Sequence, residues 1–227
     1  MSSRVFVIVP AFNEREVILS TLESLIRAQY NVVVVDDGST DGTSSLITDC
    51  SIYFLRHAIN LGQGAALQTG MTFALQEGAE IIVHFDADGQ HRIEDIETLI
   101  EPLRKGEADV ALGSRFLRQL DKSAVPPAKR LMLRAAVVVN RFATGLWLTD
   151  AHNGFRALTA DAAKRIHLHE AGFAHATEIL NEIRRAGLRY VEKPTSIRYT
   201  DYSKSKGQPL WNAVNILIDL LLRGVFK

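Results

Sequence analysis

Two aspartates separated by one residue, Asp86 and Asp88, follow an apolar run at residues 81–85. The run predicts a buried strand, so both carboxylates would lie at the carboxyl edge of a sheet, where open α/β folds bind ligands. Hard divalent cations take carboxylate and amide oxygens and keep positions open for water and phosphate. Together with the amide oxygen of Gln90, the pair therefore indicates a site for Mg²⁺ or Mn²⁺ that also accepts a diphosphate.

Charged residues also follow two other predicted strands. Asp36 and Asp37 end the run at residues 32–35, where a carboxylate can accept hydrogen bonds from the N–H or hydroxyl groups of a ligand. Such an acid can instead cap the helix that follows. Arg115 comes after the short run at residues 110–112, and a guanidinium there suits bidentate phosphate binding. An ion pair with one of the strand-end acids is the alternative for Arg115.

Several other kinds of chemistry have little support in the chain. There is no GxSxG motif for a serine hydrolase, and the histidines show no metal-ligand spacing. The glycines at residues 60–64 do not follow the first predicted strand, as those of dinucleotide-binding proteins do. Phospho-receiver domains also pair aspartates around a metal, but here the acids follow the second and fourth strands. A sugar nucleotidyltransferase would need a glycine-rich loop with arginine and lysine where this chain has PAFNE.

The elements that must position these residues alternate along the first half of the chain. Short apolar runs predict strands at residues 5–9, 32–35, 52–55, 81–85 and 110–112. Helical spacing of apolar residues predicts helices at about residues 14–30, 39–50, 64–77 and 95–105. This alternation predicts an α/β fold with a Rossmann-like, doubly wound, mostly parallel sheet. Further on, we expect helices around residues 130–146, 160–166 and 176–186, a turn at 150–154 and a strand at 190–192.

Composition and charge are consistent with one α/β domain that binds a cation and phosphates. The chain has 227 residues, 47% of them hydrophobic, and a net charge of zero. Residues 1–114 carry 7 Lys and Arg against 17 Asp and Glu, whereas residues 115–141 carry 7 against 1 and residues 184–227 carry 9 against 3. Aromatic residues are not interleaved with these basic stretches, so nucleic acid is not an expected partner. One cysteine and no leader-like segment predict a cytoplasmic protein.

The last residues, 208–227, predict an amphipathic helix. Its polar residues form a narrow stripe, which leaves a wide apolar face. The helix is too short and too interrupted by charge to span a bilayer comfortably. It could lie in a membrane interface, pack against another copy of the chain in a homo-oligomer, or pack on its own domain.

Taken in order, the motifs resemble those of family 2 glycosyltransferases, and within them dolichol-phosphate mannosyltransferase and the bacterial polyprenyl-phosphate glycosyltransferases. The resemblance covers residues 5 to about 207, and the ordered set is far more specific than any one motif. The matching segments are VIVPAFNE, VVVVDDGSTDGT, NLGQGAALQTG, FDADGQH, LGSRF, TDAHNGFRAL, Glu178 and RYTDYSKSK.

The resemblance implies an A-type glycosyltransferase fold over residues 1–207, with a nucleotide-sugar half at 1–114 and an acceptor half at 115–207. It implies that the base and ribose of the donor contact Pro10, Ala11, Glu14, Asp37, Asp86 and Ala87. A metal bridging the donor diphosphate would be held by Asp86, Asp88 and Gln90. Arg115 would contact phosphate and help to stabilise the departing diphosphate. Arg198 and Lys204, with Lys206 as an alternate to Lys204, would meet the phosphate or diphosphate of the acceptor.

The expected activity is metal-dependent, inverting transfer of a sugar from a nucleoside-diphosphate sugar to an acceptor. Polyprenyl phosphate is the acceptor we expect, with lipid contact through residues 128–147 and 209–227 and peripheral association with the cytoplasmic face of the membrane. A saccharide or soluble acceptor, or a catalytically silent subunit that binds nucleotide sugars, are the alternatives. For a hydroxyl acceptor, Asp150 is the candidate general base, and a turn-stabilising role is its alternative.

Overall fold

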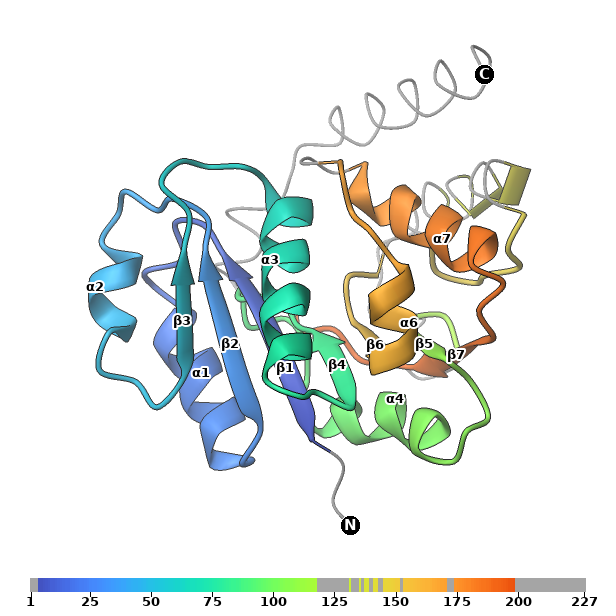
Figure 1. Cartoon of the computed structure of the whole chain (residues 1–227), viewed down its shortest axis with the longest axis horizontal. Helices are drawn as coiled ribbons and strands as arrows, with labels where there is room; N and C mark the ends of the chain where they lie inside the picture. The colour runs from blue at the N-terminus through green and yellow to red at the C-terminus, as the bar shows by residue number, and fades with distance from the viewer. Residues whose placement is uncertain are drawn as a thin grey trace.

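A seven-stranded sheet forms the centre of the computed structural model, which describes residues 4–117, 131, 135, 137–138, 141–142, 145–151, 153–170 and 174–198 (Figure 1). The strand order is β3-β2-β1-β4-β6-β5-β7. Four of the six strand pairings are parallel, and β6 runs antiparallel to both of its neighbours. The strands are β1 Val5–Ala11, β2 Asn31–Asp36, β3 Tyr53–Arg56, β4 Ile81–His84, β5 Val110–Ser114, β6 Arg156–Thr159 and β7 Tyr190–Pro194.

Helices cover both faces of the sheet. One hydrophobic cluster joins the sheet to α1 (Ile18–Arg27), α2 (Thr43–Ile47) and α4 (Glu94–Arg104). The other joins it to α3 (Gln63–Gln76), α6 (Ala160–Arg165) and α7 (His175–Arg185). A strand that is buried on both faces is apolar throughout, instead of alternating between apolar and polar residues. The sequence therefore predicts these strands as continuous apolar runs.

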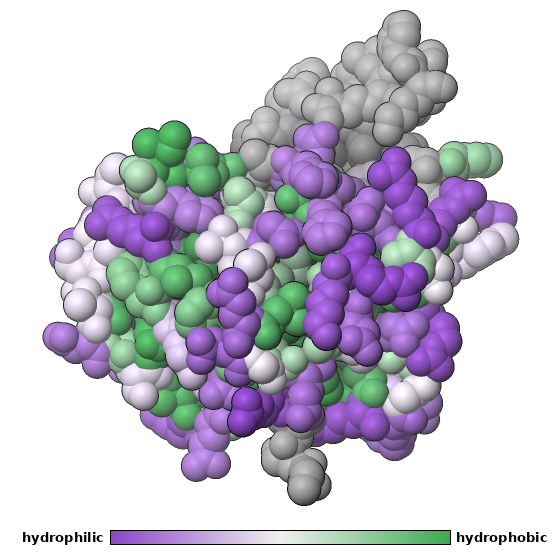
Figure 2. Space-filling view, viewed as in Figure 1, coloured by the Kyte–Doolittle hydropathy of each residue, from purple (hydrophilic) through white to green (hydrophobic). Residues whose placement is uncertain are grey.

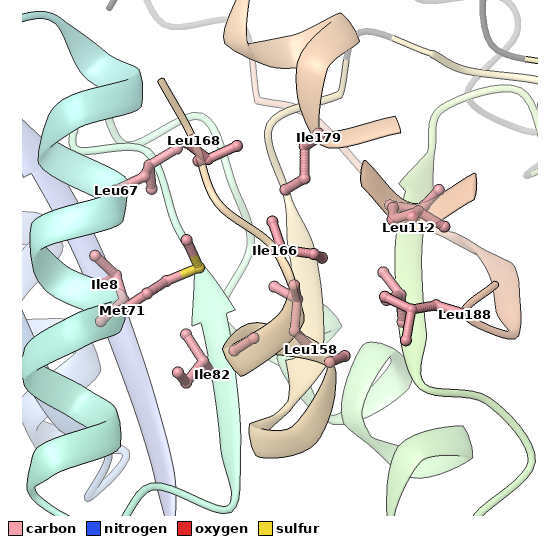
Figure 3. Packing of buried hydrophobic residues seen from close by; sticks show 14 of the residues in the cluster. Ile8, Leu67, Met71, Ile82, Leu112, Leu158, Ile166, Leu168, Ile179 and Leu188 are labelled. Carbon is pink, nitrogen blue, oxygen red and sulfur yellow. The ribbon is translucent and has the colours of Figure 1, made fainter. Parts of the chain in front are cut away.

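The second cluster shows how successive residues of a strand divide between the two faces. Figure 3 shows Ile8 of β1 and Ile82 of β4 in the same cluster as Met71 of α3 and Ile179 of α7. The neighbouring residue Val7 belongs to the opposite cluster, because successive side chains of a strand point to opposite faces. The sheet is therefore packed on both faces, and its carboxyl edge carries the loops that follow β1, β2 and β4.

Within the described residues, the predicted elements are found with one omission and some shifted ends. The omitted element is β6, Arg156–Thr159, which lies between β4 and β5. It was missed because its sequence, RALT, begins with a charge and is too short to form an apolar run. The helix predicted from residue 14 begins only at Ile18, since the preceding loop is tied to the loop after β2. The N–H of Glu14, for example, donates to Thr43 Oγ1 at 3.0 Å.

Part of the predicted lipid-binding region lies outside the described residues. This applies to the helix expected at 208–227, to Lys204 and Lys206, and to most of residues 128–147. Within residues 128–147, the described positions 131, 135, 137–138 and 141–142 are helical, as predicted. Among the helices described, none has the length and apolar character needed to cross a bilayer.

Candidate active site

A pocket of about 520 Å³ opens at the carboxyl edge of the sheet, beyond the ends of β1, β2 and β4. Much of its lining was predicted from the sequence: Pro10, Ala11, Glu14, Asp37, Asp86, Ala87 and Asp88. The remaining lining residues are Phe12, Asn60, Gly62, Gln63 and Ala66. At its rim, the loop between β3 and α3 carries the exposed side chains of Ile59 and Leu61, where hydrophobic surface gathers in Figure 2.

Asp86 follows β4 and is held by donors on both carboxylate oxygens. Gln63 Nε2 donates to Oδ1 at 2.9 Å, and His91 Nε2 lies 2.9 Å from Oδ2. Burial opposes ionisation, but the hydrogen bond from His91 and the charges of His91, Arg156 and His175 lower the pKa of Asp86 overall. Its side chain is 31% exposed, so the ionised carboxylate faces the pocket.

The pKa of Asp88 is shifted in the direction opposite to that of Asp86. Burial, followed by the neighbouring charge of Asp86, raises the pKa of Asp88 to about 6. The N–H of Gln90 donates to Asp88 Oδ1 at 2.9 Å, which fixes one oxygen of the carboxylate. Two carboxylates that raise each other's energy in one pocket are a common arrangement for binding a cation, because the cation removes the repulsion.

The donor set fits Mg²⁺ or Mn²⁺ shared with a phosphate ligand. Such ions are often bound through one or two carboxylates, with water and substrate phosphates completing the shell. Within the described part of the chain, no group of three or more His, Cys, Asp or Glu side chains could enclose a metal. A cation held by Asp86 and Asp88 would therefore depend on oxygen atoms from a ligand.

Asp37 organises the wall of the pocket formed by the loop after β3. Its carboxylate accepts the N–H groups of Leu61 at 2.9 Å and Gly62 at 2.7 Å, and His57 Nδ1 lies 2.7 Å from Oδ1. Gly62 has a φ of 94°, a conformation that other residues rarely adopt. Asp36 points elsewhere: it is fully buried, accepts the N–H of Ser39 at 3.0 Å, and takes no part in the pocket lining.

Arg115 and Asp150 form an ion pair that does not line this pocket. Arg115 Nε lies 2.6 Å from Asp150 Oδ2 and Nη2 lies 2.6 Å from Oδ1, and the N–H of Arg115 donates to Oδ2 at 3.0 Å. Glu192 of β7 accepts the N–H of Asp150 at 3.1 Å and so holds the segment in place. The structure thus brings these two predicted residues together, but both oxygens of the candidate base are engaged.

The main chain of the predicted acceptor residue Arg198 contacts Gln90, which follows Asp88 by two residues. The N–H of Arg198 donates to the carbonyl oxygen of Gln90 at 2.9 Å, and the Arg198 side chain is exposed. His91 and Ile197 form an antiparallel bridge beside this contact. Residues from the end of the described chain therefore border the DADGQH loop, although the two regions are far apart in the sequence.

A buried basic cluster lies behind Asp86. Arg156 is 2% exposed, and no described residue forms a hydrogen bond with its Nη1. Neither ring nitrogen of its directly paired neighbour, His84, has a partner in the part of the chain that the structure describes. Burial, followed by the charges of Arg156 and His175, lowers the pKa of His84 to about 3. His84 is therefore neutral, and Arg156 supplies a fixed positive charge that favours the ionised form of Asp86.

Sequence reasoning missed several residues that shape the site. Phe12 and Asn60 stand inside quoted motifs and line the pocket, but their types indicate no specific chemistry. Gly154 packs so closely that a Cβ there would lie 2.7 Å from Asp86 Oδ2. Gln63 and His91 were visible in the motifs, and only their contacts reveal that both hold Asp86.

The sheet with its antiparallel β6, and the aspartate pair at the edge of the pocket, define an A-type glycosyltransferase. Mannosyl-3-phosphoglycerate synthase from Rubrobacter xylanophilus shares the fold, with a TM-score of 0.71 and 15% identity over 98% of this chain and 72% of that one. The chain belongs to glycosyl transferase family 2, whose model matches residues 6–166.

Two relatives align over most of their length and of this chain. The undecaprenyl-phosphate mannosyltransferase of Micrococcus luteus is 32% identical over 89% of this chain and 87% of its own. The UDP-N-acetylglucosamine–dolichyl-phosphate N-acetylglucosaminyltransferase of Methanococcus voltae is 28% identical over 96% and 95%. The protein is therefore a glycosyltransferase.

Proposed function

We propose that this enzyme transfers a sugar from a nucleoside-diphosphate sugar to a polyprenyl phosphate, with inversion at the anomeric carbon and with Mg²⁺ or Mn²⁺ as cofactor. The observation that carries the proposal is the presence of Asp86 and Asp88 in one pocket with Glu14 and Asp37. The names of the two relatives above, each aligned over nearly all of its length, favour a lipid phosphate as the acceptor.

The donor nucleotide would occupy the pocket at the end of β1. Pro10, Ala11 and Glu14 would contact the base and ribose, together with Asp37, Asp86 and Ala87, which line the same pocket. Asp37 would act largely through the loop that it orders. Asp86, Asp88 and Gln90 would hold the cation, which when bound offsets the charge that develops on the departing diphosphate.

In the transfer itself, an acceptor oxygen forms a bond to the anomeric carbon on the face opposite the diphosphate, and the bond from that carbon to the diphosphate oxygen breaks. An acceptor phosphate is anionic near neutral pH, so the reaction needs no strong base. The engagement of Asp150 with Arg115 favours a positioning role for Asp150 in that case. With a hydroxyl acceptor, Asp150 would have to act as the base.

The acceptor phosphate would be met by basic residues of the second half of the chain. Arg115 is oriented by Asp150, and Arg198 is anchored beside Gln90. Lys204, or Lys206 in its place, would complete the set. The lipid would be approached from the cytoplasmic face of the membrane through residues 128–147 and 209–227, whose sequences are apolar on one side.

Radiolabelled sugar transfer tests the proposal directly. UDP-, GDP- and dTDP-sugars are first ranked by thermal shift with and without Mn²⁺, and the stabilising donor is then incubated with polyprenyl phosphate. We expect label to enter the organic phase with the wild-type protein and not with Asp88→Asn. Label that stays in the aqueous phase on an added saccharide would indicate a soluble acceptor, and tight donor binding without any transfer would indicate a silent subunit.

A further inference from the structure

We propose that His91 is a positioning residue, whose ring donates a hydrogen bond that fixes the Asp86 carboxylate toward the pocket. The inference deepens the proposed function and rests on it, because it concerns the aspartate that would hold the cation. It adds a residue that contacts neither nucleotide nor sugar and acts through Asp86.

The first observation is the way in which the His91 ring is held. The ring is stacked on Phe155, with centroids 4.7 Å apart and planes at 29°. It also meets the edge of Phe85 at 5.5 Å, and Phe85 and Phe155 contact each other at 5.4 Å. The residue is only 6% exposed, so the ring cannot turn without disrupting this packing.

The direction of the hydrogen bond follows from its two partners. Asp86 is an ionised carboxylate and can only accept, so the proton must be on His91 Nε2, which lies 2.9 Å from Oδ2. The other ring nitrogen, Nδ1, is buried and has no hydrogen-bond partner within the described ranges of the chain. Among the residues that the structure describes, the polar contact of the ring is therefore the one it makes to Asp86, and the aromatic packing orients the ring for that contact.

Two further residues confine the same carboxylate. Gln63 of α3 donates to Oδ1, and Gly154 presses against Oδ2, where a Cβ would come within 2.7 Å. Each carboxylate oxygen can accept two hydrogen bonds, so the contacts made by described residues leave one acceptor position on each oxygen. Asp86 also lines the pocket, so these remaining positions are open to a cation. Residues that orient a ligand in this way typically change metal affinity by about 10–100-fold when they are replaced.

The test compares two substitutions that remove different properties of His91. His91→Phe keeps a ring to stack on Phe155 and removes the donor, whereas His91→Gln keeps an N–H near the position of Nε2 and removes the ring. Mn²⁺ binding is followed by electron paramagnetic resonance with whichever of UDP, GDP or dTDP stabilises the wild-type protein, and thermal midpoints are recorded in parallel. The exposed His167, replaced by Phe, is the control.

We expect His91→Phe to weaken Mn²⁺ binding by about 10-fold or more while changing the thermal midpoint less than His91→Gln does. His91→Gln should bind Mn²⁺ more tightly than His91→Phe. If His91→Phe bound Mn²⁺ more tightly than His91→Gln, or as tightly as the wild type, His91 would contribute only through its packing and not through its hydrogen bond to Asp86.

Gly154→Ala provides a second check, because its Cβ would displace the Asp86 carboxylate while the His91 side chain itself is unchanged. Mn²⁺ affinity equal to that of the wild type would overturn the proposal that the position of Asp86 matters. Failure of the proposed function looks different. In that case the wild-type protein itself would bind no Mn²⁺ with any of these nucleotides, or would bind it equally well with Asp88→Asn.

Discussion

At the scale of single residues, the site combines two carboxylates with opposite electrostatic environments. Asp86 has a lowered pKa because donors and positive charges surround it, whereas burial and the charge of Asp86 raise the pKa of Asp88 to about 6. Asp88 is thus the residue whose state changes near neutral pH. A cation would bring its pKa down, so binding of Mn²⁺ should release a proton and weaken as the pH falls below about 6.

The first prediction concerns the stability of the protein without a cation. The pKa of Asp88 is raised in the folded state, so protonated Asp88 favours folding. This contribution to the free energy of unfolding is complete at pH values below the ordinary pKa of an aspartate. It is lost as the pH rises through about 6, where the buried carboxylate ionises. Asp88→Asn should therefore raise the thermal midpoint in EDTA at pH 7.5, by about 2–4 °C for each kcal/mol gained. At pH 4 the two proteins should unfold at similar temperatures. A lower thermal midpoint for the variant than for the wild type at pH 7.5 would contradict the claim that ionised Asp88 destabilises the fold beside Asp86.

The second prediction concerns the ion pair of Arg115 with Asp150, whose side chains are 12% and 1% exposed. Arg115→Met leaves a buried carboxylate without its partner, which should lower the free energy of unfolding by about 3–5 kcal/mol. The double variant Arg115→Met, Asp150→Leu should recover part of that loss, because no charge is left buried. Urea unfolding of the single and double variants measures the coupling, and strictly additive losses would contradict it.

Transfer assays with Asp150→Asn, Arg115→Met and the combination of the two separate the two roles of Asp150. If Asp150 positions Arg115, then Asp150→Asn and Arg115→Met should impair transfer to polyprenyl phosphate to a similar degree, and the double variant should be little worse. A base would behave differently: Asp150→Asn would abolish transfer while Arg115→Met would retain a good part of it.

Much of the site was predictable at this scale because the residues are charged and end apolar runs. Asp86, Asp88 and Asp37 were identified in this way, and they line one pocket. His91 and Gln63 were not predicted, since a histidine or glutamine gains its role here from a contact with Asp86. Gly154 could not be predicted either, because its importance lies in the space it leaves.

At the scale of elements, the loops are tied to one another by side chains at the strand ends. The loop after β1 is bonded to the loop after β2, where Thr40 N–H donates to Asn13 Oδ1 at 2.9 Å. Asp37 in turn orders the loop between β3 and α3. The pocket wall is therefore shaped before a ligand binds, which lowers the entropic cost of binding.

The third prediction tests the loop held by Asp37. Asp37→Asn replaces one accepting oxygen by an amide that donates, so one of the N–H groups of Leu61 and Gly62 loses its partner. We expect the free energy of unfolding to fall by about 1–3 kcal/mol and donor affinity to fall with it. Hydrogen exchange of the amides at 61 and 62 should accelerate more than exchange in the core of β2. Unchanged exchange would show that the loop does not depend on Asp37.

The strands of the first half were predictable because burial on both faces leaves continuous apolar runs. β6 was not predictable, because its strand conformation depends on tertiary contacts. The sequence RALT becomes a central strand only through its pairing with β4 and β5. Arg156 begins that strand and is buried behind Asp86, so the element missed in the sequence is also the one that places Arg156 and Gly154 against the site. Long-range pairing of this kind leaves little local signal.

At the scale of the whole molecule, the pocket proposed for the donor and the region proposed for the acceptor meet at the DADGQH loop. The segment after β7 reaches this loop, where the N–H of Arg198 donates to the carbonyl oxygen of Gln90. The division into a nucleotide-sugar half at 1–114 and an acceptor half at 115–207 remains a prediction, as does the contact of residues 208–227 with a membrane.

The fourth prediction tests that contact in the full chain. Replacing Ile218 and Leu222 by aspartate puts two charges on the predicted apolar face of the last helix. Co-sedimentation with vesicles containing anionic lipid should decrease, while the thermal midpoint with donor and Mn²⁺ should stay within about 2 °C of the wild-type value, or roughly 1 kcal/mol. A change of oligomeric mass with unchanged sedimentation would show that the face binds a second copy instead.

The central claim is that Asp86 and Asp88 share a divalent cation beside a diphosphate at the carboxyl edge of the sheet. Crystals grown with Mn²⁺ and the preferred nucleoside diphosphate would test it through the anomalous signal of manganese. We predict one strong peak within about 2.0–2.5 Å of a carboxylate oxygen of each aspartate and in contact with the diphosphate, the range for such oxygen ligands. A diphosphate bound in the pocket with no peak near these two residues, or with manganese elsewhere, would contradict the claim.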